Sequence, residues 1–337
     1  MTLRLQLHVG HGKTGSSFLQ SWLAANASVL LAQHQLLYPQ VCPFTRARDR
    51  RAEQSQFSLG NGFVLNPVLE AGVSWRRQQR WWRRLCRQQG VQPEQLSSLM
   101  FSHEPWARQL PSQWPQLLQL AELMEAQAVD CWLLVRDPLD HALSVYGQMV
   151  KRHGFSGSVE DWLGIYDFPE VLMRFLDEVE ASRQNVCLRV DHYGSQRQEL
   201  LACLKQWLVL PSAGPWHAIT GELVNRSLTP SELTLMRWLN ARDPNLALRT
   251  GEHLIQRLPQ LRGAGGAPSA PVIERFVQKW QDAIAQLNQR LPSQAQLSLP
   301  SPEDGDPPSS NEASGDPAVR LTREQLECVL DAAQGKP

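Results

Sequence analysis

A dense set of anion-binding residue types lies near the start of the chain, in LHVGHGKTGSSFLQSWL (residues 7–23). Its central residues are Gly10, His11, Gly12, Lys13, Thr14, Gly15, Ser16 and Ser17. The three glycines permit positive φ and a close approach of the backbone. Successive N–H groups at the start of a following helix can face an anion, and Lys13 and three hydroxyls add donors. The stretch is typical of a loop that holds a phosphate or a sulfate, although a plain strand–turn–helix junction would have the same composition.

The nucleotide-binding P-loop, G-x-x-x-x-G-K-S/T, fits this stretch only in part. Gly12, Lys13 and Thr14 supply its last three letters, but Leu7 stands where its first glycine belongs. The apolar run CWLLV ends in Arg136 and not in an acid that would hold magnesium. A P-loop-type kinase is therefore an alternative that both departures count against.

A second cationic motif, RDPLDHALS, follows the apolar run at residues 129–135. Arg136 comes directly after this expected strand, and Ser144 lies eight residues further on, within an expected helix. Lys13 and Arg136 thus both follow a strand. Ligands of parallel sheets bind at the carboxyl ends of the strands, so an anion site is expected there.

Together, the two motifs resemble the cofactor signatures of sulfotransferases that use 3′-phosphoadenosine 5′-phosphosulfate (PAPS). In that family the first loop has Pro, Lys, a hydroxyl residue, Gly and two more hydroxyl residues, and it binds the 5′-phosphosulfate. Here Gly12 replaces the proline. The second motif has Arg, Asp or Asn, and Pro, with a Ser eight residues after the Arg, and it binds the 3′-phosphate. The resemblance implies that the cofactor is bound by Gly12, Lys13, Thr14, Gly15, Ser16, Ser17, Arg136 and Ser144.

The resemblance extends loosely from Leu3 to about residue 240, and VNRSLTPSEL (residues 224–233) is similar to a segment of bacterial members. It implies a P-loop NTPase-like sulfotransferase fold and metal-independent transfer of a sulfuryl group from PAPS, with PAP as product. The acceptor would be a hydroxyl of a small molecule or a glycan. A catalytically silent module that binds PAP or a glycan is a further alternative, which the retained Lys13, Arg136 and Ser144 count against.

A base for the acceptor proton is expected in LMFSHEPW, after the short apolar run at residues 99–101. Many sulfotransferases have a histidine base at this place, which His103 matches, and bacterial and glycan-acting members often have Ser-x-Glu, which Ser102 and Glu104 match. Histidine titrates near neutrality, whereas a glutamate needs its pKa raised by burial. The sequence therefore ranks His103 slightly above Glu104. Lys13 is expected to neutralise the leaving group, so the catalytic candidates are Lys13, His103 and Glu104.

Strands and helices alternate through the first two thirds of the chain. An alternating pattern that meets Gly10 predicts a strand at residues 3–9, and apolar runs predict strands at residues 99–101, 129–135 and 186–190. The helical period predicts helices at residues 17–31, 75–89, 114–126, 139–152 and 199–208. Nearly continuous apolar strands that alternate with helices predict an α/β fold, a three-layer arrangement with helices flanking a parallel sheet.

The last third is expected to be helical. Thr229 and Glu232 form a capping box, and Thr322 with Gln325 starts a terminal helix. Between them, an apolar stripe over residues 273–287 predicts a helix packed on the core. The domain prediction is a sulfotransferase domain at residues 1–295, a disordered acidic Pro/Ser-rich linker at 296–319 and a short helix at 320–337.

The charges of the 337-residue chain balance, with Lys+Arg and Asp+Glu both at 33. Ten arginines nevertheless lie between Arg46 and Gly90, many of them on the helix predicted at residues 75–89. The favoured interpretation is a helix that packs a face formed by Trp75, Trp82, Leu85 and Cys86 and leaves its arginines solvated. Binding of an acidic acceptor is the alternative. Nucleic acid is disfavoured because the patch is short and the net charge is zero.

Cysteine usage and hydropathy predict a reducing, cytoplasmic setting. The six cysteines form no CxxC pair, which fits neither a zinc site nor a dense disulfide framework. No apolar run approaches the roughly 20 residues of a membrane helix, and the N-terminus is too short and too alternating for a signal peptide. The sequence predicts no membrane span and leaves the acceptor and the oligomeric state open.

Overall fold

The computed structural model forms two compact units. It describes residues 2–49, 58–182, 185–196, 199–219, 226–261, 263, 268–300 and 319–335. Unit 1 comprises Met1–Arg136, Phe168–Gly221 and Gln286–Leu297. Unit 2 comprises Asp137–Asp167, Glu222–Ala285 and Ser298–Pro337. Most of the predicted acidic linker, at residues 301–318, lies outside the described residues.

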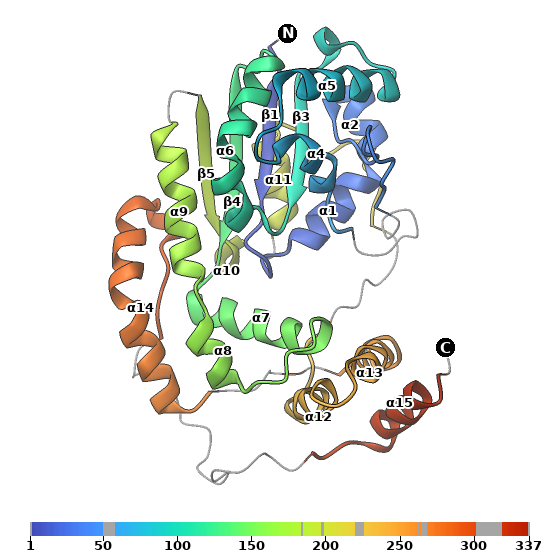
Figure 1. The fold of residues 1–337 in the computed structure, drawn as a ribbon, viewed down its shortest axis with the longest axis vertical. Coiled ribbons are helices and arrows are strands. Elements are labelled where there is room, and N and C mark those ends of the chain that lie inside the picture. The colour runs from blue at the N-terminus through green and yellow to red at the C-terminus, as the bar shows by residue number, and fades with distance from the viewer. Residues whose placement is uncertain are drawn as a thin grey trace. The chain divides into compact units, whose positions relative to one another are not determined.

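Unit 1 is built on a five-stranded sheet in which every strand pair is parallel (Figure 1). The strands are β1 (Arg4–Val9), β2 (Leu36–Leu37), β3 (Ser98–His103), β4 (Ala128–Val135) and β5 (Val186–His192). Their order in the sheet is β2-β3-β1-β4-β5. Val9 is paired with His103 on one side and Leu133 on the other, so β1 and β3 end at the same level. The predicted α/β fold with a parallel sheet is confirmed.

Helices cover both faces of this sheet (Figure 1). On one face, α1 (Ser16–Ala25), α2 (Ala27–His34) and α11 (Leu200–Trp207) share an apolar cluster with Met100, Trp132 and Leu134 of the strands. The other face is covered by α5 (Trp75–Gln89), α6 (Trp106–Leu123) and α9 (Phe168–Ala181). There Trp81 of α5 lies against Phe101, with ring centroids 6.4 Å apart. Most residues of β1, β3 and β4 are therefore shielded from water on both faces, which accounts for the apolar runs of β3 and β4 in the sequence.

The helix predicted at residues 17–31 is divided into α1 and α2 at Asn26. The Asn26 amide nitrogen donates to the carbonyls of Trp22 (2.9 Å) and His217 (3.0 Å), and its oxygen accepts from the backbone N–H of His217 (2.7 Å). This side chain ties the end of α1 to a segment 191 residues away, which a local sequence pattern cannot show.

The helix predicted at residues 114–126 begins earlier, at Trp106, and this part of the prediction is wrong. Proline lacks a backbone N–H and normally marks a helix boundary. Pro111 and Pro115 nevertheless lie inside α6. Trp106, Leu110 and Trp114 are buried along this helix, so its packing on the sheet outweighs the two lost hydrogen bonds.

The arginine-rich helix α5 packs its tryptophan face, as the favoured interpretation predicts. Its buried residues follow the helical spacing and are Gln78, Trp81, Trp82, Leu85 and Cys86. Its exposed residues include Arg76, Arg77, Arg80, Arg83, Arg84 and Arg87. The prediction is wrong for Trp75, which is 40% exposed because it is the first residue of the helix.

Unit 2 is helical. Its main helices are α7 (Pro138–Arg152), α8 (Val159–Ile165), α12 (Pro230–Asn240), α13 (Pro244–Arg257) and α15 (Arg323–Ala333). Both predicted capping boxes are confirmed: Thr229 with Glu232 begins α12, and Thr322 with Gln325 begins α15. The predicted apolar stripe lies on α14 (Ala270–Arg290). Among the helices of the described residues, none combines the length and apolarity that crossing a bilayer requires.

Candidate functional site

The glycine-rich loop joins β1 to α1 with a backbone bent to surround an anion. Three of its residues have left-handed φ values: Gly12 (72°), Lys13 (54°) and Gly15 (80°). This conformation is uncommon for a lysine. Such bends turn successive N–H groups into one concavity, a common anion-binding arrangement. No side chain caps the start of α1. The Phe18 N–H donates to the carbonyl of Gly15, and the N–H groups of Ser16 and Ser17 before it can face a ligand.

Two hydroxyls of this loop are buried without a partner. The Oγ1 atom of Thr14 and the Oγ atom of Ser16 form no hydrogen bond with any of the described residues. A buried polar group left in this state costs about 1–3 kcal/mol. The oxygen atoms of a phosphate or sulfate group would accept both hydrogen bonds, so the loop fits such an anion.

The start of the loop is packed tightly against the end of β3. The backbone N–H of Gly10 donates to the carbonyl of His103 at 2.9 Å. A Cβ atom on Gly10 would lie 2.3 Å from the Cα atom of Glu104, closer than atoms can approach. Glycine at position 10 therefore allows the contact that brings Glu104 up to the loop.

Lys13 and Glu104 influence each other's charge in this half-buried setting. Burial lowers the pKa of Lys13; the negative charge of Glu104 opposes that shift, and Arg136 adds to it. Burial raises the pKa of Glu104, against the effects of Lys13 and of a hydrogen bond from Ser17. That bond, from Ser17 Oγ to Glu104 Oε1, is 3.4 Å long. The result is a carboxyl group with a raised pKa beside the lysine, suited to accept a proton.

His103 points instead toward the packed interior. A Cβ atom on Gly62 would lie 2.5 Å from the Cβ atom of His103, and the ring edge meets Trp106 at a centroid distance of 5.6 Å. Burial lowers the pKa of His103 to about 4, although a hydrogen bond with the backbone of Leu59 opposes this shift. The structure surrounds His103 with packing partners and leaves Glu104 at the loop.

Arg136 contacts the backbone of the loop. Its Nη1 atom donates to the carbonyl of Lys13 at 3.2 Å, and its guanidinium carbon lies 5.7 Å from the ring centroid of Tyr193. Tyr193 begins α10 (Tyr193–Gln196) and also borders Gly15, where an added Cβ atom would lie 3.1 Å from Tyr193 Cε2. The sequence analysis missed Tyr193. Its position directly after β5, like that of Arg136 after β4, was the available signal.

A buried polar network lies beside the loop. Ser102, the serine of the Ser-x-Glu match, is fully buried. Its Oγ atom is 2.8 Å from His8 Nδ1 and accepts from Gln20 Nε2 at 3.0 Å. Ser102 thus links β1 and β3 to α1, and its hydroxyl is engaged in holding the scaffold.

The structure brings most of the predicted site residues together in unit 1. They are Gly12, Lys13, Thr14, Gly15, Ser16, Ser17, Glu104 and Arg136. Ser144 is half-buried on α7 in unit 2, and its role in cofactor binding stays a prediction. Among the described residues, no three His, Cys, Asp or Glu side chains gather as a metal site would require.

Comparison with solved structures gives a distant likeness. No family model matches the chain, and no curated protein matches it. A similar solved structure is a sulfotransferase from Alicyclobacillus acidocaldarius. The two are 12% identical, and the match covers 76% of this chain and 98% of that chain with a TM-score of 0.36. At this identity and score, the likeness carries no information about activity or site residues.

Proposed function

We propose that this protein is a PAPS-dependent sulfotransferase that transfers a sulfuryl group to a hydroxyl of an acceptor. The observation that carries the proposal is the loop itself: Lys13 in a left-handed conformation, two unpartnered buried hydroxyls, and Arg136 on the loop backbone. Convergent N–H groups and two cationic side chains can neutralise an anion without a metal ion.

The donor groups of the loop suit the 5′-phosphosulfate of PAPS. When bound, PAPS supplies a sulfuryl group already activated by its link to a phosphate. Thr14 and Ser16 would donate their free hydroxyls to this anion, together with the first N–H groups of α1. Lys13 would stabilise the charge that develops on the leaving phosphate, which makes it a catalytic residue and a binding residue.

Glu104 is proposed as the general base, ahead of His103. Its carboxyl group lies beside Lys13 and Ser17, and burial has raised its pKa toward the range in which a base works well. His103 is packed against Gly62 and Trp106. The ranking drawn from the sequence is therefore reversed in this proposal, and His103 is assigned to supporting the end of β3.

Arg136 is proposed to bind the 3′-phosphate of the cofactor, and Ser144 keeps the cofactor-binding role that the family resemblance implies. The family resemblance supports this assignment, and so does the position of Arg136 at the carboxyl end of β4, next to the loop. The guanidinium group of Arg136 lies over the ring of Tyr193, a cation–π contact that favours this placement. A guanidinium suits bidentate binding of a phosphate.

The acceptor is proposed to be a small molecule or a glycan, with no nucleic acid partner. A cytoplasmic location is also proposed, in keeping with six free cysteines, five of them buried. The acceptor would be identified with a panel of sugars, phenols and sterols and a radiolabelled sulfate donor. Transfer of label to a hydroxyl compound is the expected result.

Cofactor binding provides the direct test. Titration calorimetry with PAP in EDTA should show binding, and saturating PAP at about 100 times its Kd should stabilise the fold by roughly 2.7 kcal/mol. If ATP with magnesium stabilised the protein and PAP did not, the kinase hypothesis would be favoured. Binding of PAP without transfer to any acceptor would select the silent module. Failure of PAP to bind would overturn the proposal.

Two variants separate the two ends of the cofactor. Arg136→Ala should lower the affinity for PAP far more than the affinity for adenosine 5′-phosphosulfate, which lacks the 3′-phosphate. Lys13→Ala should lower the turnover rate strongly, and Lys13→Arg should not restore it, because a planar guanidinium cannot replace a point charge. Arg174→Ala, at an exposed arginine of α9, is the matched control and should leave both ligands unaffected. If Arg136→Ala lowered the affinity for both ligands equally, Arg136 would not be the residue that binds the 3′-phosphate.

A further inference from the structure

One face of the unit 1 sheet carries polar side chains over the first part of its strands. They are Ser98 of β3, Arg4 and Gln6 of β1 and Asp130 of β4, and Arg189 of β5 lies on the same face, level with Trp132. Further along, this face carries the apolar Met100, Trp132 and Leu134, which pack with α1 and α11, together with the buried polar residues His8, Ser102 and Asp191. Strands of a parallel sheet covered on both faces are expected to be apolar throughout. The polar stretch departs from this rule, and such departures are expected at functional sites.

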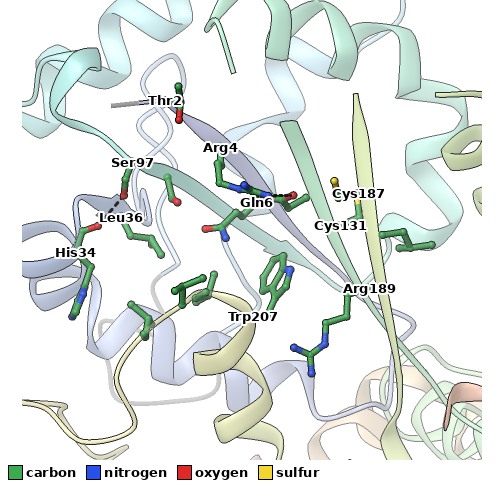
Figure 2. A pocket seen from close by; sticks show the side chains of 16 residues that line it. Thr2, Arg4, Gln6, His34, Leu36, Ser97, Cys131, Cys187, Arg189 and Trp207 are labelled. Atoms are coloured by element: carbon green, nitrogen blue, oxygen red, sulfur yellow. Dashed lines mark hydrogen bonds and ion pairs between the residues drawn. The ribbon is translucent and has the colours of Figure 1, made fainter. Parts of the chain in front are cut away.

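A cavity of about 520 Å³ opens over this polar stretch. Figure 2 shows Arg4 and Gln6 of β1 at its centre, with Trp207 on one side and Leu36 on the other. The volume falls within the range of roughly 300–1,000 Å³ that is typical of small-molecule sites. The glycine-rich loop lies at the opposite end of β1, where Gly10 is four residues, or roughly 13 Å of strand, beyond Gln6.

Gln6 provides a polar contact point that the protein itself does not use. Its side chain is 4% exposed, and its Oε1 atom has no hydrogen-bond partner among the described residues. Figure 2 shows its amide directed into the space between Trp207 and Leu36. A ligand with an O–H or N–H group in the cavity would satisfy this atom.

The cavity also offers guanidinium donors and an apolar wall. Arg4 is ion-paired with Asp130 through two bonds, and Arg189 donates to Asp191 at 2.6 Å and to Gln206 Oε1 at 3.3 Å. A guanidinium has five N–H donors, and these side chains are 45% and 30% exposed, so both keep donors for an anion. Trp207, at the end of α11, adds a flat apolar surface.

We propose that this cavity is a second ligand site, which binds a small hydroxylated aromatic carboxylate. The ring would lie against Trp207, the carboxylate would meet Arg189, and the hydroxyl would donate to Gln6 Oε1. The proposal is independent of the proposed sulfotransferase function, because none of these residues belongs to the glycine-rich loop.

The probe for this site is 4-hydroxybenzoate, titrated calorimetrically into the full chain. Benzoate lacks the hydroxyl and phenol lacks the carboxylate, so each should bind about tenfold more weakly, corresponding to 1.4 kcal/mol. Absence of measurable heat with 4-hydroxybenzoate would overturn the proposal. Equal affinity for all three compounds would overturn the assigned contacts and the ligand class with them.

Variants place the probe within the molecule. Gln6→Leu replaces the unpartnered amide with a branched apolar side chain one bond shorter, so the melting temperature should stay the same or rise. Binding of 4-hydroxybenzoate should fall about tenfold in Gln6→Leu and in Arg189→Gln. Arg87→Gln, at an exposed arginine of α5, is the control and should bind normally. Wild-type affinity in both Gln6→Leu and Arg189→Gln would overturn the proposal, and so would loss of probe binding in Lys13→Ala, which would place the probe at the loop.

Discussion

Gly10 and Glu104 are in backbone contact, so closely that a Cβ atom on Gly10 would lie 2.3 Å from the Glu104 Cα atom. This contact joins the end of β1 to the residue after β3 and sets the position of Glu104 beside Lys13. The proposed base and the proposed anion-binding lysine therefore depend on a residue that has no side chain.

Gly10→Ala should destabilise the protein and disrupt the site. Main-chain atoms of Glu104 cannot move as the end of a flexible side chain can, so we expect a loss of about 1–3 kcal/mol or more, as in overpacked cores. PAP binding should weaken as well, because the loop would be displaced. Urea unfolding and titration calorimetry measure the two effects.

Gly147→Ala is the matched control for this substitution. Gly147 lies within α7, and no heavy atom lies within 4 Å of the Cβ atom it would gain. Replacing a helical glycine by alanine should stabilise the fold by roughly 0.5–1 kcal/mol. If Gly10→Ala were as stable as Gly147→Ala, the close packing of Gly10 on Glu104 would be refuted.

Burial of His103 should make stability depend on pH. Its folded pKa is lowered to about 4 from the ordinary 6.5. Below pH 6.5 the unfolded chain binds a proton at His103 that the folded chain does not bind, so stability falls as the pH drops toward 4. Between pH 7 and pH 5 this residue should account for a loss of about 2 kcal/mol. His103→Asn should show a correspondingly smaller loss by urea unfolding.

His217→Asn is the comparison variant, because His217 is exposed and bonds through its backbone. It should lose as much stability between pH 7 and pH 5 as the wild type. His8 is also buried, with its pKa lowered to about 4, so His103→Asn retains part of the acid sensitivity. An unchanged loss in His103→Asn would show that the folded protein protonates His103, and would restore it as the favoured base.

Much of the fold follows from local sequence patterns. The alternation of residues 3–9 predicts β1, and the apolar runs predict β4 and β5, each to within two residues. A strand that is buried on both faces has few polar side chains, which is clearest in β4. The capping boxes predict the starts of α12 and α15, because Thr229 and Thr322 bond to residues three positions away. These features depend on neighbours in the chain, which a sequence displays directly.

The remaining features depend on distant partners. Asn26 separates α1 from α2 through its hydrogen bonds to His217. Tyr193 lies beside the loop because β5, which it follows, is in the same sheet as β1 and separated from it only by β4. The loop motif identifies Lys13 and the neighbouring hydroxyl residues. The choice of His103 or Glu104 as the proposed base depends on how each side chain is buried. Gly62 and Trp106, which surround His103, are far from the loop in sequence and give no signal there.

Gln325 should anchor the terminal helix α15 to α12. Its Nε2 atom donates to Glu232 Oε1 at 2.8 Å, and Glu232, fully buried, also receives two bonds of 2.8 Å from Arg226. Gln325→Ala removes one donor from this buried carboxylate and should cost about 1–3 kcal/mol in urea unfolding. PAP affinity should not change.

Arg323→Ala is the control on the same helix. Arg323 is exposed, and its ion pair with Glu327 is a surface contact worth well under 1 kcal/mol. If Gln325→Ala were as mild as Arg323→Ala, the bond to Glu232 would contribute little to holding α15.

The pH dependence of turnover tests Glu104 as the base. Because burial raises its pKa above the ordinary value of 4.5, kcat/KM should rise with pH through an apparent pKa above that value. Glu104→Gln should lower kcat by ~10²–10⁴ and spare PAP affinity, since a base contacts the acceptor. Ser17→Ala removes a hydrogen bond that favours the carboxylate, so it should move the acid limb to higher pH, whereas Ser17→Thr keeps a hydroxyl and should not. An acid limb that persists unchanged in Glu104→Gln would show that another group accepts the proton.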